Sequence, residues 1–337
     1  MLLLGKSVRG IAFAFALAML CVPYPSWAQQ PAKTARVVML SDYFSGRSGA
    51  ERTSAFRQGL RELGWAEGKN LVIEERHAAN EEQRRQIAAE MEQSRPDVIL
   101  ACNPCASRAA PSGPAPIRGI PIVFIFSDPV EAKMVNSLAR PGGSMTGLST
   151  QGIELNAKRL QVLKGTLPKL ARVGVLVSRN HVLRDRMVTE IQDAAPKLKV
   201  RLQLFEISSD EPAEKIDAAF EAMSRDGTQA VLGLQGPHFG RERNRITRLA
   251  LKYRLPGIFY QGESVEQGAL MTYEPKLVDL VHRAAGYVDK ILRGAKPGDL
   301  PVEQPNTFEF AVNLRTAKAM GVTIPPSVLL QASRVIE

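Results

Sequence analysis

Two cysteines three positions apart form the most reactive pair of side chains in this 337-residue sequence. They lie in 98-VILACNPCASRAA-110, where an apolar run leads into Cys102-Asn103-Pro104-Cys105 and a helix-compatible segment follows. A Cys-x-x-Cys pair at a helix N-terminus can have a lowered thiol pKa, and the thiolate is the nucleophile of disulfide exchange. The pattern therefore fits a redox centre, a local disulfide, or two thiols in a ligand-binding loop.

Other patterns that carry chemistry are missing from the sequence. The four histidines, His77, His181, His238 and His282, are widely separated, and none belongs to an HExxH motif. The sequence contains no GxSxG motif, no P-loop lysine motif and no GxGxxG motif after a strand. Two cysteines supply only half of the ligands of a structural zinc site. We therefore predict no metal, no cofactor and no enzyme activity, and keep a thiol–disulfide oxidoreductase as the alternative function.

The N-terminal segment has the three parts of a secretory signal peptide. Lys6 and Arg9 precede an apolar stretch, Ile11 to Val22, and Ser26-Trp27-Ala28 places small residues before a cleavage point. We predict removal of residues 1–28 and a periplasmic location, with an uncleaved anchor as the alternative. Leu20 precedes Cys21, where a lipoprotein signal would have a small residue. Export also permits a disulfide between the two remaining cysteines.

The charge of the chain is basic but scattered. The formal net charge is +10, and it becomes +8 when Lys6 and Arg9 leave with the signal segment. The densest basic run, 241-RERNRITR-248, is interpreted as a solvated helix face. It has no interleaved aromatic residues and no known docking motif, so we predict that nucleic acid is not a partner.

Short apolar strands alternate with amphipathic helices along the whole chain. In the first helix, for example, Phe56, Leu60 and Leu63 recur at helical spacing before Gly64. The segment 138–149 contains Arg-Pro-Gly-Gly and is interpreted as a turn that separates two sets of strand–helix units. We therefore predict an α/β fold with two doubly wound parallel-sheet lobes. The expected strands are 36–41, 71–75, 97–101, 122–126, 172–177, 201–206, 230–234, 257–260, 270–273 and 308–313. The expected helices are 50–63, 81–93, 153–166, 182–195, 211–224, 239–253, 276–293 and 314–320.

Several motifs carry a resemblance to a known family over essentially the whole chain after the signal segment. They are 56-FRQGLRELGW-65, 68-GKN-70, 120-IPIVFIFSDPV-130, 138-LARPGGSMTGLS-149, 159-RLQVLKGTLP-168, 267-QGALMTYEP-275, 294-GAKPGDLPVEQP-305 and 315-RTAKAMGVTIPPSVLLQA-332. In this order they resemble the ABC-transporter substrate-binding proteins with a type I periplasmic-binding fold, a family with tryptophan- and tyrosine-binding members.

The resemblance implies two lobes joined by a three-strand hinge, with crossings near 147–150, 268–273 and 305–310. The N-terminal lobe would comprise 29–148 and 271–304, including helix 276–293, and the C-terminal lobe 149–270 and 305–337. A small-molecule ligand would bind in the cleft between the lobes, and closure would present it to an ABC permease in the inner membrane. The family favours an amino acid or an aromatic or organic acid, without chemistry on the ligand. A ligand sensor for a membrane receptor is a further alternative.

Ligands of open parallel sheets gather beyond the carboxyl ends of the strands, where helix N-termini expose backbone N–H groups. This rule, applied to the predicted strands, selects loops rich in hydroxyl, amide and aromatic side chains. The residues that we expect to contact the ligand are Asp42, Tyr43, Ser45, Asn103, Ser127, Asp128, Asn180, Gln235, Tyr260 and Gln261.

Each expected contact has a structural alternative. Asp42 and Asp128 can cap the following turn or helix, although either would also suit a ligand amino group. Tyr43 can pack half-buried, and Gln235 can belong to a solvent-facing turn. The loops that hold Cys102 and Asn180 also depart from the family pattern, which usually has small residues at the first and an Asn-Pro turn at the second.

Overall fold

The computed structural model describes residues 34–40, 46–77, 81–102, 105–110, 113 and 116–337. The predicted signal segment, residues 1–28, lies outside this part of the chain. Ala35–Glu337 clusters as one unit that contains two β-sheets. Among the described residues, no helix is both long and apolar enough to cross a membrane.

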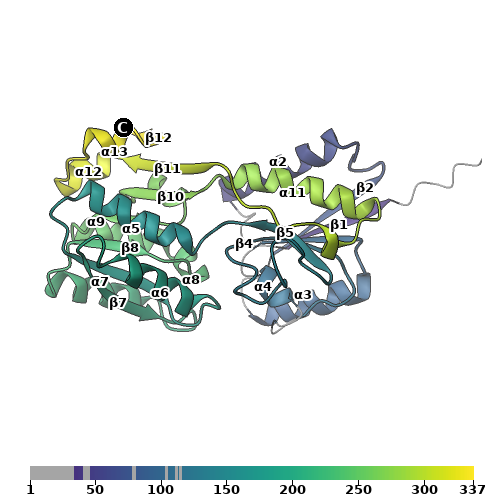
Figure 1. Ribbon diagram of the computed structural model, residues 1–337, viewed down its shortest axis with the longest axis horizontal. Coiled ribbons are helices and arrows are strands. Elements are labelled where there is room, and N and C mark those ends of the chain that lie inside the picture. Colours follow the sequence, from purple (N-terminus) through teal and green to yellow (C-terminus); the bar gives the residue numbers. More distant parts are fainter. Residues whose placement is uncertain (1–33, 41–45, 78–80, 103–104, 111–112, 114–115) are drawn as a thin grey trace, which may run out of the picture. The chain divides into compact units, whose positions relative to one another are not determined.

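The first sheet is entirely parallel, with strand order β2-β1-β3-β4-β5. We call this sheet and the helices packed on it the first lobe (Figure 1). Its strands are β1 (Ala35–Leu40), β2 (Leu71–Arg76), β3 (Val98–Cys102), β4 (Ile122–Phe126) and β5 (Met145–Ser149). The helices within this stretch of sequence are α2 (Gly46–Glu62), α3 (Glu81–Ser94) and α4 (Cys105–Ala109).

Strand residues of the first sheet alternate between two hydrophobic cores. Val98 and Leu100 pack in one cluster with Phe56 of α2, whereas Ile99 packs in another with Met91 of α3. Successive side chains of a strand point to opposite faces, so a continuous apolar run is what a sheet covered on both faces requires.

The second sheet, in the second lobe, has the strand order β12-β11-β10-β9-β8-β6-β7. Its strands are β6 (Arg172–Ser178), β7 (Arg201–Ile207), β8 (Ala230–Gly233), β9 (Gly257–Phe259), β10 (Met271–Pro275), β11 (Phe308–Asn313) and β12 (Arg334–Ile336). Its helices are α5 (Glu154–Thr166), α6 (Arg184–Ala194), α7 (Glu214–Arg225), α8 (Pro237–Arg241), α9 (Arg243–Lys252), α10 (Glu263–Glu266), α12 (Leu314–Met320) and α13 (Pro326–Leu329). The pair β10–β11 is antiparallel and the other pairs are parallel.

The late helix α11 (Leu277–Leu292) packs on the first sheet rather than on the second. Its residues Leu280, Ala284 and Val288 share a cluster with Phe56 and Leu60 of α2, and Figure 1 shows the two helices side by side. The 3₁₀ helix η3 (Pro297–Asp299) follows, and the bridge between Leu148 and Glu303 keeps this segment beside β5.

The chain therefore passes between the lobes at 150–153, at Lys276 and at 304–307. The sequence analysis placed the second crossing at 268–273 and assigned 271–304 to the first lobe. That boundary needs correction, because Met271–Pro275 pairs antiparallel with β11 and belongs to the second sheet.

Other elements also differ from the sequence analysis, among them the short helices α10 and α13, which were not predicted. The stretch interpreted as a connecting turn contains the buried strand β5, and the expected helix 239–253 is two helices that meet at Glu242. The short strand β12 was not predicted, because its three residues are partly exposed and lack the apolar run that identified the others.

Gly147 in β5 permits a close approach of two strands. Its φ is 152°, and a Cβ there would overlap the carbonyl oxygen of Phe124 and lie 2.6 Å from the Phe124 nitrogen. We expect Gly147→Ala to lower the free energy of unfolding by about 2–4 kcal/mol, because neither backbone can move away easily. The measurement is urea denaturation followed by circular dichroism.

Gly286→Ala is the matched control for this variant. Gly286 lies inside α11, and a Cβ there meets nothing within 4 Å. Alanine has the higher helix propensity, so we expect a gain of about 0.5–1 kcal/mol. Equal stability of the two variants would contradict the close approach at Gly147.

Candidate functional site

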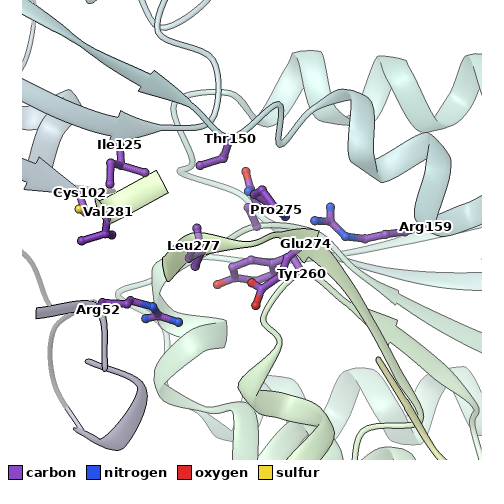
Figure 2. A pocket seen from close by; sticks show the side chains of 11 residues that line it. Arg52, Cys102, Ile125, Thr150, Arg159, Tyr260, Glu274, Pro275, Leu277 and Val281 are labelled. Atoms are coloured by element: carbon purple, nitrogen blue, oxygen red, sulfur yellow. The ribbon is translucent and has the colours of Figure 1, made fainter. Parts of the chain in front are cut away.

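A cavity is lined by side chains from both lobes. Its empty space is about 500 Å³, a figure that includes solvent at its open side. Figure 2 shows how the lining side chains converge on it. The lining residues are Arg52, Cys102, Ile125, Thr150, Arg159, Gln235, Tyr260, Glu274, Pro275, Leu277 and Val281.

One wall of the cavity is apolar and comes mainly from the first lobe. Cys102 ends β3, Ile125 lies in β4, and Val281 and Leu277 lie in the first two turns of α11. Cys102, Ile125 and Val281 are buried in the core between the first sheet and α11. Such a wall suits the hydrophobic part of a ligand.

Arg159 places a buried cation on the opposite side. This residue of α5 is 1% exposed. Its Nε donates to the carbonyl oxygen of Tyr273 at 2.8 Å, and its Nη1 donates to Oδ1 of Asn156 at 2.7 Å. A buried charge is costly unless it is hydrogen-bonded, so these bonds hold the guanidinium in one orientation beside β10.

Arg52 joins the two lobes through an ion pair. Its Nη2 lies 2.6 Å from Oε1 of Glu263 at the start of α10, and both side chains are largely shielded from water. Arg243 approaches the same carboxylate at 3.9 Å. Glu263 is thereby shared between two cations, one in each lobe.

Glu274 is a carboxyl group in an unfavourable environment. Burial raises its pKa to about 7; Arg52 and the Gly262 N–H oppose the rise, while the nearby charges of Glu263 and Glu309 add to it. Glu274 is paired with Glu309 across β10 and β11, so two acidic residues face each other in register. Desolvation is the main cause of the shift.

Two buried polar groups lack a hydrogen-bond partner within the described part of the chain, one in the cavity wall and one behind Arg159. Thr150 lines the cavity and is 4% exposed, and its Oγ1 makes no hydrogen bond there. Asn156 is fully buried beside Arg159, and its Nδ2 is likewise unsatisfied. Unsatisfied buried polar groups are costly, and they are expected where a ligand completes the bonding.

Ser127 and Gln235 form a direct hydrogen bond between the lobes. The Ser127 hydroxyl donates to Oε1 of Gln235 at 2.6 Å, and the Ser127 carbonyl accepts from the Ser149 hydroxyl at 2.8 Å. Gly152 leaves room for the Gln235 amide, since a Cβ there would lie 2.5 Å from its Nε2.

Comparison with known proteins identifies the family. The model of the ABC transporter substrate binding protein family matches residues 38–336. The chain belongs to this family. A tyrosine-binding protein of Clostridioides difficile (strain R20291) is 26% identical over 270 residues, which cover 79% of this chain and 75% of that protein. These proteins are substrate-binding proteins and not enzymes.

Solved structures agree on the fold. A conserved domain protein from Vibrio cholerae has a TM-score of 0.80 and 25% identity, and the match covers 90% of this chain and 100% of that one. An ABC domain from Streptococcus pneumonia in complex with L-Trp has a TM-score of 0.80, 21% identity and the same coverage. A sugar-binding protein of Bacillus halodurans has a TM-score of 0.59 at 13% identity, with 84% of this chain and 99% of that one covered. The predicted family and the two-lobed α/β fold are thus confirmed.

The structure brings some of the predicted contact residues of this family member together at the cavity. Gln235 and Tyr260 line it, and Ser127 is bonded to Gln235. The Tyr260 hydroxyl donates to the carbonyl of Gly236 at 2.9 Å, which holds the ring against the loop. Four of the predicted residues lie outside the described residues: Asp42, Tyr43, Ser45 and Asn103.

The remaining three predicted residues do not line the cavity. Asp128 accepts from the backbone nitrogens of Val130 and Glu131 at 3.2 and 3.0 Å, which is the capping alternative. Asn180 is exposed and donates to the Ser209 hydroxyl at 2.8 Å. Gln261 lies against Gly240 and lines a smaller cavity inside the second lobe.

Sequence reasoning missed the charged residues of the cavity. Arg159 carried a detectable signal, because it lies four residues after Leu155 and four before Leu163 on the buried stripe of a helix. A charge on such a stripe is unusual unless it is paired. Arg52 and Glu274 carried no comparable signal, because charged residues are common in exposed positions of helices and strand ends.

The two cysteines are thiols on different faces of the first sheet. Cys102 is 4% exposed and packs in the core with α11, whereas Cys105 is 3% exposed and packs in the core that contains α3. Of the three alternatives, the structure contains the two thiols, one of them in the wall of the cavity. Among the described residues, no group of three or more His, Cys, Asp and Glu could hold a metal ion.

Two histidines lie at the carboxyl ends of the strands of the second sheet. Burial lowers the pKa of His181 to about 4, and the charge of His238 adds to this effect. Burial also lowers the pKa of His238 to about 4, helped by Arg241 and opposed by Glu211. Within the described residues, neither ring nitrogen of His238 has a hydrogen-bond partner.

These histidines should make the protein less stable in mild acid. In the unfolded chain these histidines take up protons near pH 6.5, whereas in the folded chain they do so only near pH 4. Their contribution to the free energy of unfolding is therefore complete above pH 6.5 and is lost as the pH falls toward 4. Glu274, whose pKa is raised, has the opposite slope between about 4.5 and 7. We expect His238→Phe to reduce the stability difference between pH 7.5 and 5.0 by about 1–2 kcal/mol relative to the natural protein.

Urea denaturation at the two pH values measures this difference. His77→Phe is the control, because the His77 side chain is 45% exposed. If both variants kept the pH dependence of the natural protein, the buried neutral state of His238 would be refuted.

Proposed function

We propose that the chain is an exported solute-binding protein that holds a small amino-acid-like molecule in this cavity, between its lobes, and delivers it to an ABC importer. The single observation that carries the proposal is the composition of the cavity. An apolar wall from the first lobe faces two arginines and a glutamate. This combination suits a ligand with a hydrophobic body and a charged head group.

The two arginines of the cavity are suited to bind a carboxylate of the ligand. Arg159 is a buried guanidinium and Arg52 lies at the other end of the same cavity. A guanidinium binds carboxylates with two parallel N–H donors, and its attraction is stronger where water is excluded. The Thr150 hydroxyl adds a donor that a ligand oxygen would satisfy.

The apolar wall limits the rest of the ligand. Ile125, Val281 and Leu277 contribute aliphatic groups, and Tyr260 and Pro275 contribute flat surfaces. An amino acid with an aromatic or branched side chain matches this wall better than a sugar, whose hydroxyl groups would remain unsatisfied there. The tyrosine-binding relative and the L-Trp complex support the same class of ligand.

Delivery to an importer would depend on relative movement of the lobes. Three short connections carry the chain between them, and the bonds Ser127–Gln235 and Arg52–Glu263 join them at the cavity. A ligand that contacts both lobes favours the closed arrangement. The predicted signal segment and periplasmic location belong to this proposal, as does an ABC permease in the membrane as the partner.

A thermal-shift screen of the chain from Gln29 onward tests the ligand class. The probes are the twenty L-amino acids, with glucose and arabinose as sugar controls. A ligand at about one hundred times its Kd should add roughly 2.7 kcal/mol of apparent stability. We expect shifts with L-tyrosine, L-tryptophan or L-leucine and none with the sugars. The absence of a shift with any amino acid would refute the proposed ligand class.

Thr150→Val tests whether the ligand occupies the cavity. The change removes a hydroxyl that has no partner among the described residues, so we expect the ligand-free protein to become slightly more stable. A ligand that bonds to this hydroxyl should bind about 5- to 20-fold more weakly, equivalent to about 1–2 kcal/mol. Isothermal titration calorimetry measures the affinity.

Thr53→Val is the matched control for this experiment. Thr53 in α2 is 5% exposed and its hydroxyl also has no hydrogen-bond partner among the described residues, but it does not line the cavity. The control should keep the affinity of the natural protein. Equal affinities of all three proteins would show that the ligand does not bond to Thr150.

A further inference from the structure

We infer that Glu274 receives the amino group of the ligand and makes this site select amino acids over organic acids of the same shape. The inference rests on the proposed function, because it concerns the same cavity. It adds a residue that determines specificity and a dependence of binding on pH.

The first argument is the position of the carboxylate. Glu274 is the second-last residue of β10 and lines the cavity. The backbone N–H of Gly262 donates to this carboxylate. A Cβ at Gly262 would overlap Oε1 of Glu274 and lie 3.1 Å from its Cδ, so the carboxylate packs closely against the loop before α10.

Opposite charges also lie along the same end of β10. The carbonyl that accepts the Arg159 Nε hydrogen bond belongs to Tyr273, the residue directly before Glu274. The guanidinium of Arg159 is therefore bonded to β10 at Tyr273, and the carboxylate belongs to the next residue of that strand. Figure 2 shows Glu274 and Tyr260 between Arg159 and Arg52 in that view. An α-amino acid carries its carboxylate and ammonium on one carbon, so a head group bound beside this end of β10 would present opposite charges to these two residues.

The third argument is the balance of charges around Glu274. Arg52 of α2 attracts it, but this guanidinium lies 2.6 Å from Glu263 of α10. Glu309 of β11 lies opposite in register and Arg334 of β12 lies 3.6 Å from Glu309. Glu263 and Glu309 both disfavour the ionised form of Glu274. An added cation would relieve this repulsion and would stabilise the carboxylate.

An unsatisfied hydroxyl in the same cavity points independently to a bound molecule. The Thr150 hydroxyl lines the same cavity in a residue that is 4% exposed, and it has no partner within the described part of the chain. A carboxylate oxygen would accept its hydrogen bond while the ammonium of the same molecule reaches Glu274. A zwitterion satisfies both requirements, and an organic acid without an amino group satisfies only the first.

The expected consequence is binding that strengthens as the pH rises. Burial raises the pKa of Glu274 to about 7, so this carboxyl group is largely protonated at pH 5.5 and largely ionised at pH 8.0. Only the ionised form attracts an ammonium group. Below the pKa, each unit of pH reduces the affinity by up to tenfold, which gives roughly a tenfold to thirtyfold difference between the two pH values.

Calorimetric titration with L-tyrosine and with 3-(4-hydroxyphenyl)propionate, which lacks the amino group, tests the inference. For the natural chain from Gln29 onward, we expect L-tyrosine to bind at least tenfold more tightly at pH 8.0 than at pH 5.5. The propionate should bind at least tenfold more weakly than L-tyrosine at pH 8.0, and it should not gain affinity as the pH rises. If tyrosine gives too little heat, L-leucine and 4-methylpentanoate form an equivalent pair.

Glu274→Gln removes the charge and preserves the shape. We expect this variant to lose at least tenfold in affinity for the amino acid at pH 8.0, to lose the pH dependence, and to bind the deaminated acid as well as the natural protein does. Glu309→Gln is the control, because Glu309 does not line the cavity, and it should retain most of the preference. The comparison of the two acids on the natural protein does not depend on the folding of any variant.

The possible failures are distinguishable. If no amino acid binds to the natural protein at either pH, the proposed function and this inference both fail. If amino acids bind but the deaminated acid binds equally well, or if Glu274→Gln retains both affinity and pH dependence, only the role of Glu274 is refuted.

Discussion

A guanidinium that is almost completely withdrawn from water organises the cavity. Arg159 lies on α5, within the second lobe, and is tied to the carbonyl of Tyr273 in β10 and to Asn156 in its own helix. The desolvation of a charge is costly, so these bonds must be maintained whenever the lobe is folded. Because Tyr273 is fixed, the residues that follow it are also placed, and Glu274, Pro275 and Leu277 all line the cavity. One buried side chain thus positions the crossing to α11.

The crossing of the chain at Lys276 gives the two lobes different parts of the cavity lining. After this crossing, α11 packs on the first sheet, where Val281 joins Ile125 and Cys102 in the apolar wall. Most of the polar lining, including Arg159, belongs to the second lobe. In the proposed function, the first lobe holds the hydrophobic body of the ligand and the second lobe holds its head group. Because both lobes line the cavity, ligand binding would be coupled to closure.

Much of the fold was predictable because its strands are continuous apolar runs. The strands Ile122–Phe126 and Phe308–Asn313 begin and end where the sequence predicted. Periodicity could not show that β10 pairs antiparallel with β11, since strand direction depends on contacts between distant segments. It also missed β5, whose Met-Thr-Gly-Leu-Ser sequence has few β-branched residues and follows a Gly-Gly turn. The destination of α11 came only from the family resemblance.

The residues that line the cavity were less predictable than the fold. The rule that ligands gather at the carboxyl ends of strands selected the loops of Gln235 and Tyr260, and both residues line the cavity. It could not identify Arg52, because that residue lies inside a helix, or Glu274, because β10 runs into the crossing rather than into a helix of its own lobe. Asp128 satisfied the rule, but its side chain accepts hydrogen bonds from the backbone nitrogens of Val130 and Glu131. Which acidic side chain is available to a ligand depends on hydrogen bonds that the sequence does not specify.

The cavity concentrates several groups that a stable fold would avoid. Glu274 can ionise only at the cost of desolvation, and within the described residues the Oγ1 of Thr150 and, behind Arg159, the Nδ2 of Asn156 are unsatisfied. Proteins tolerate such local violations mainly where function requires them, since each lowers the stability of the folded state. Cys102 is not an unfavourable group of this kind, because a buried thiol in an apolar wall acts as a small hydrophobic group. Its neighbour Cys105 packs on the other face of the sheet, so the Cys-x-x-Cys spacing reflects two separate packing positions. A molecule that bonds to Thr150, approaches Arg159 and neutralises Glu274 would remove several of these energetic costs at once. The affinity of the site would then come largely from the removal of these costs.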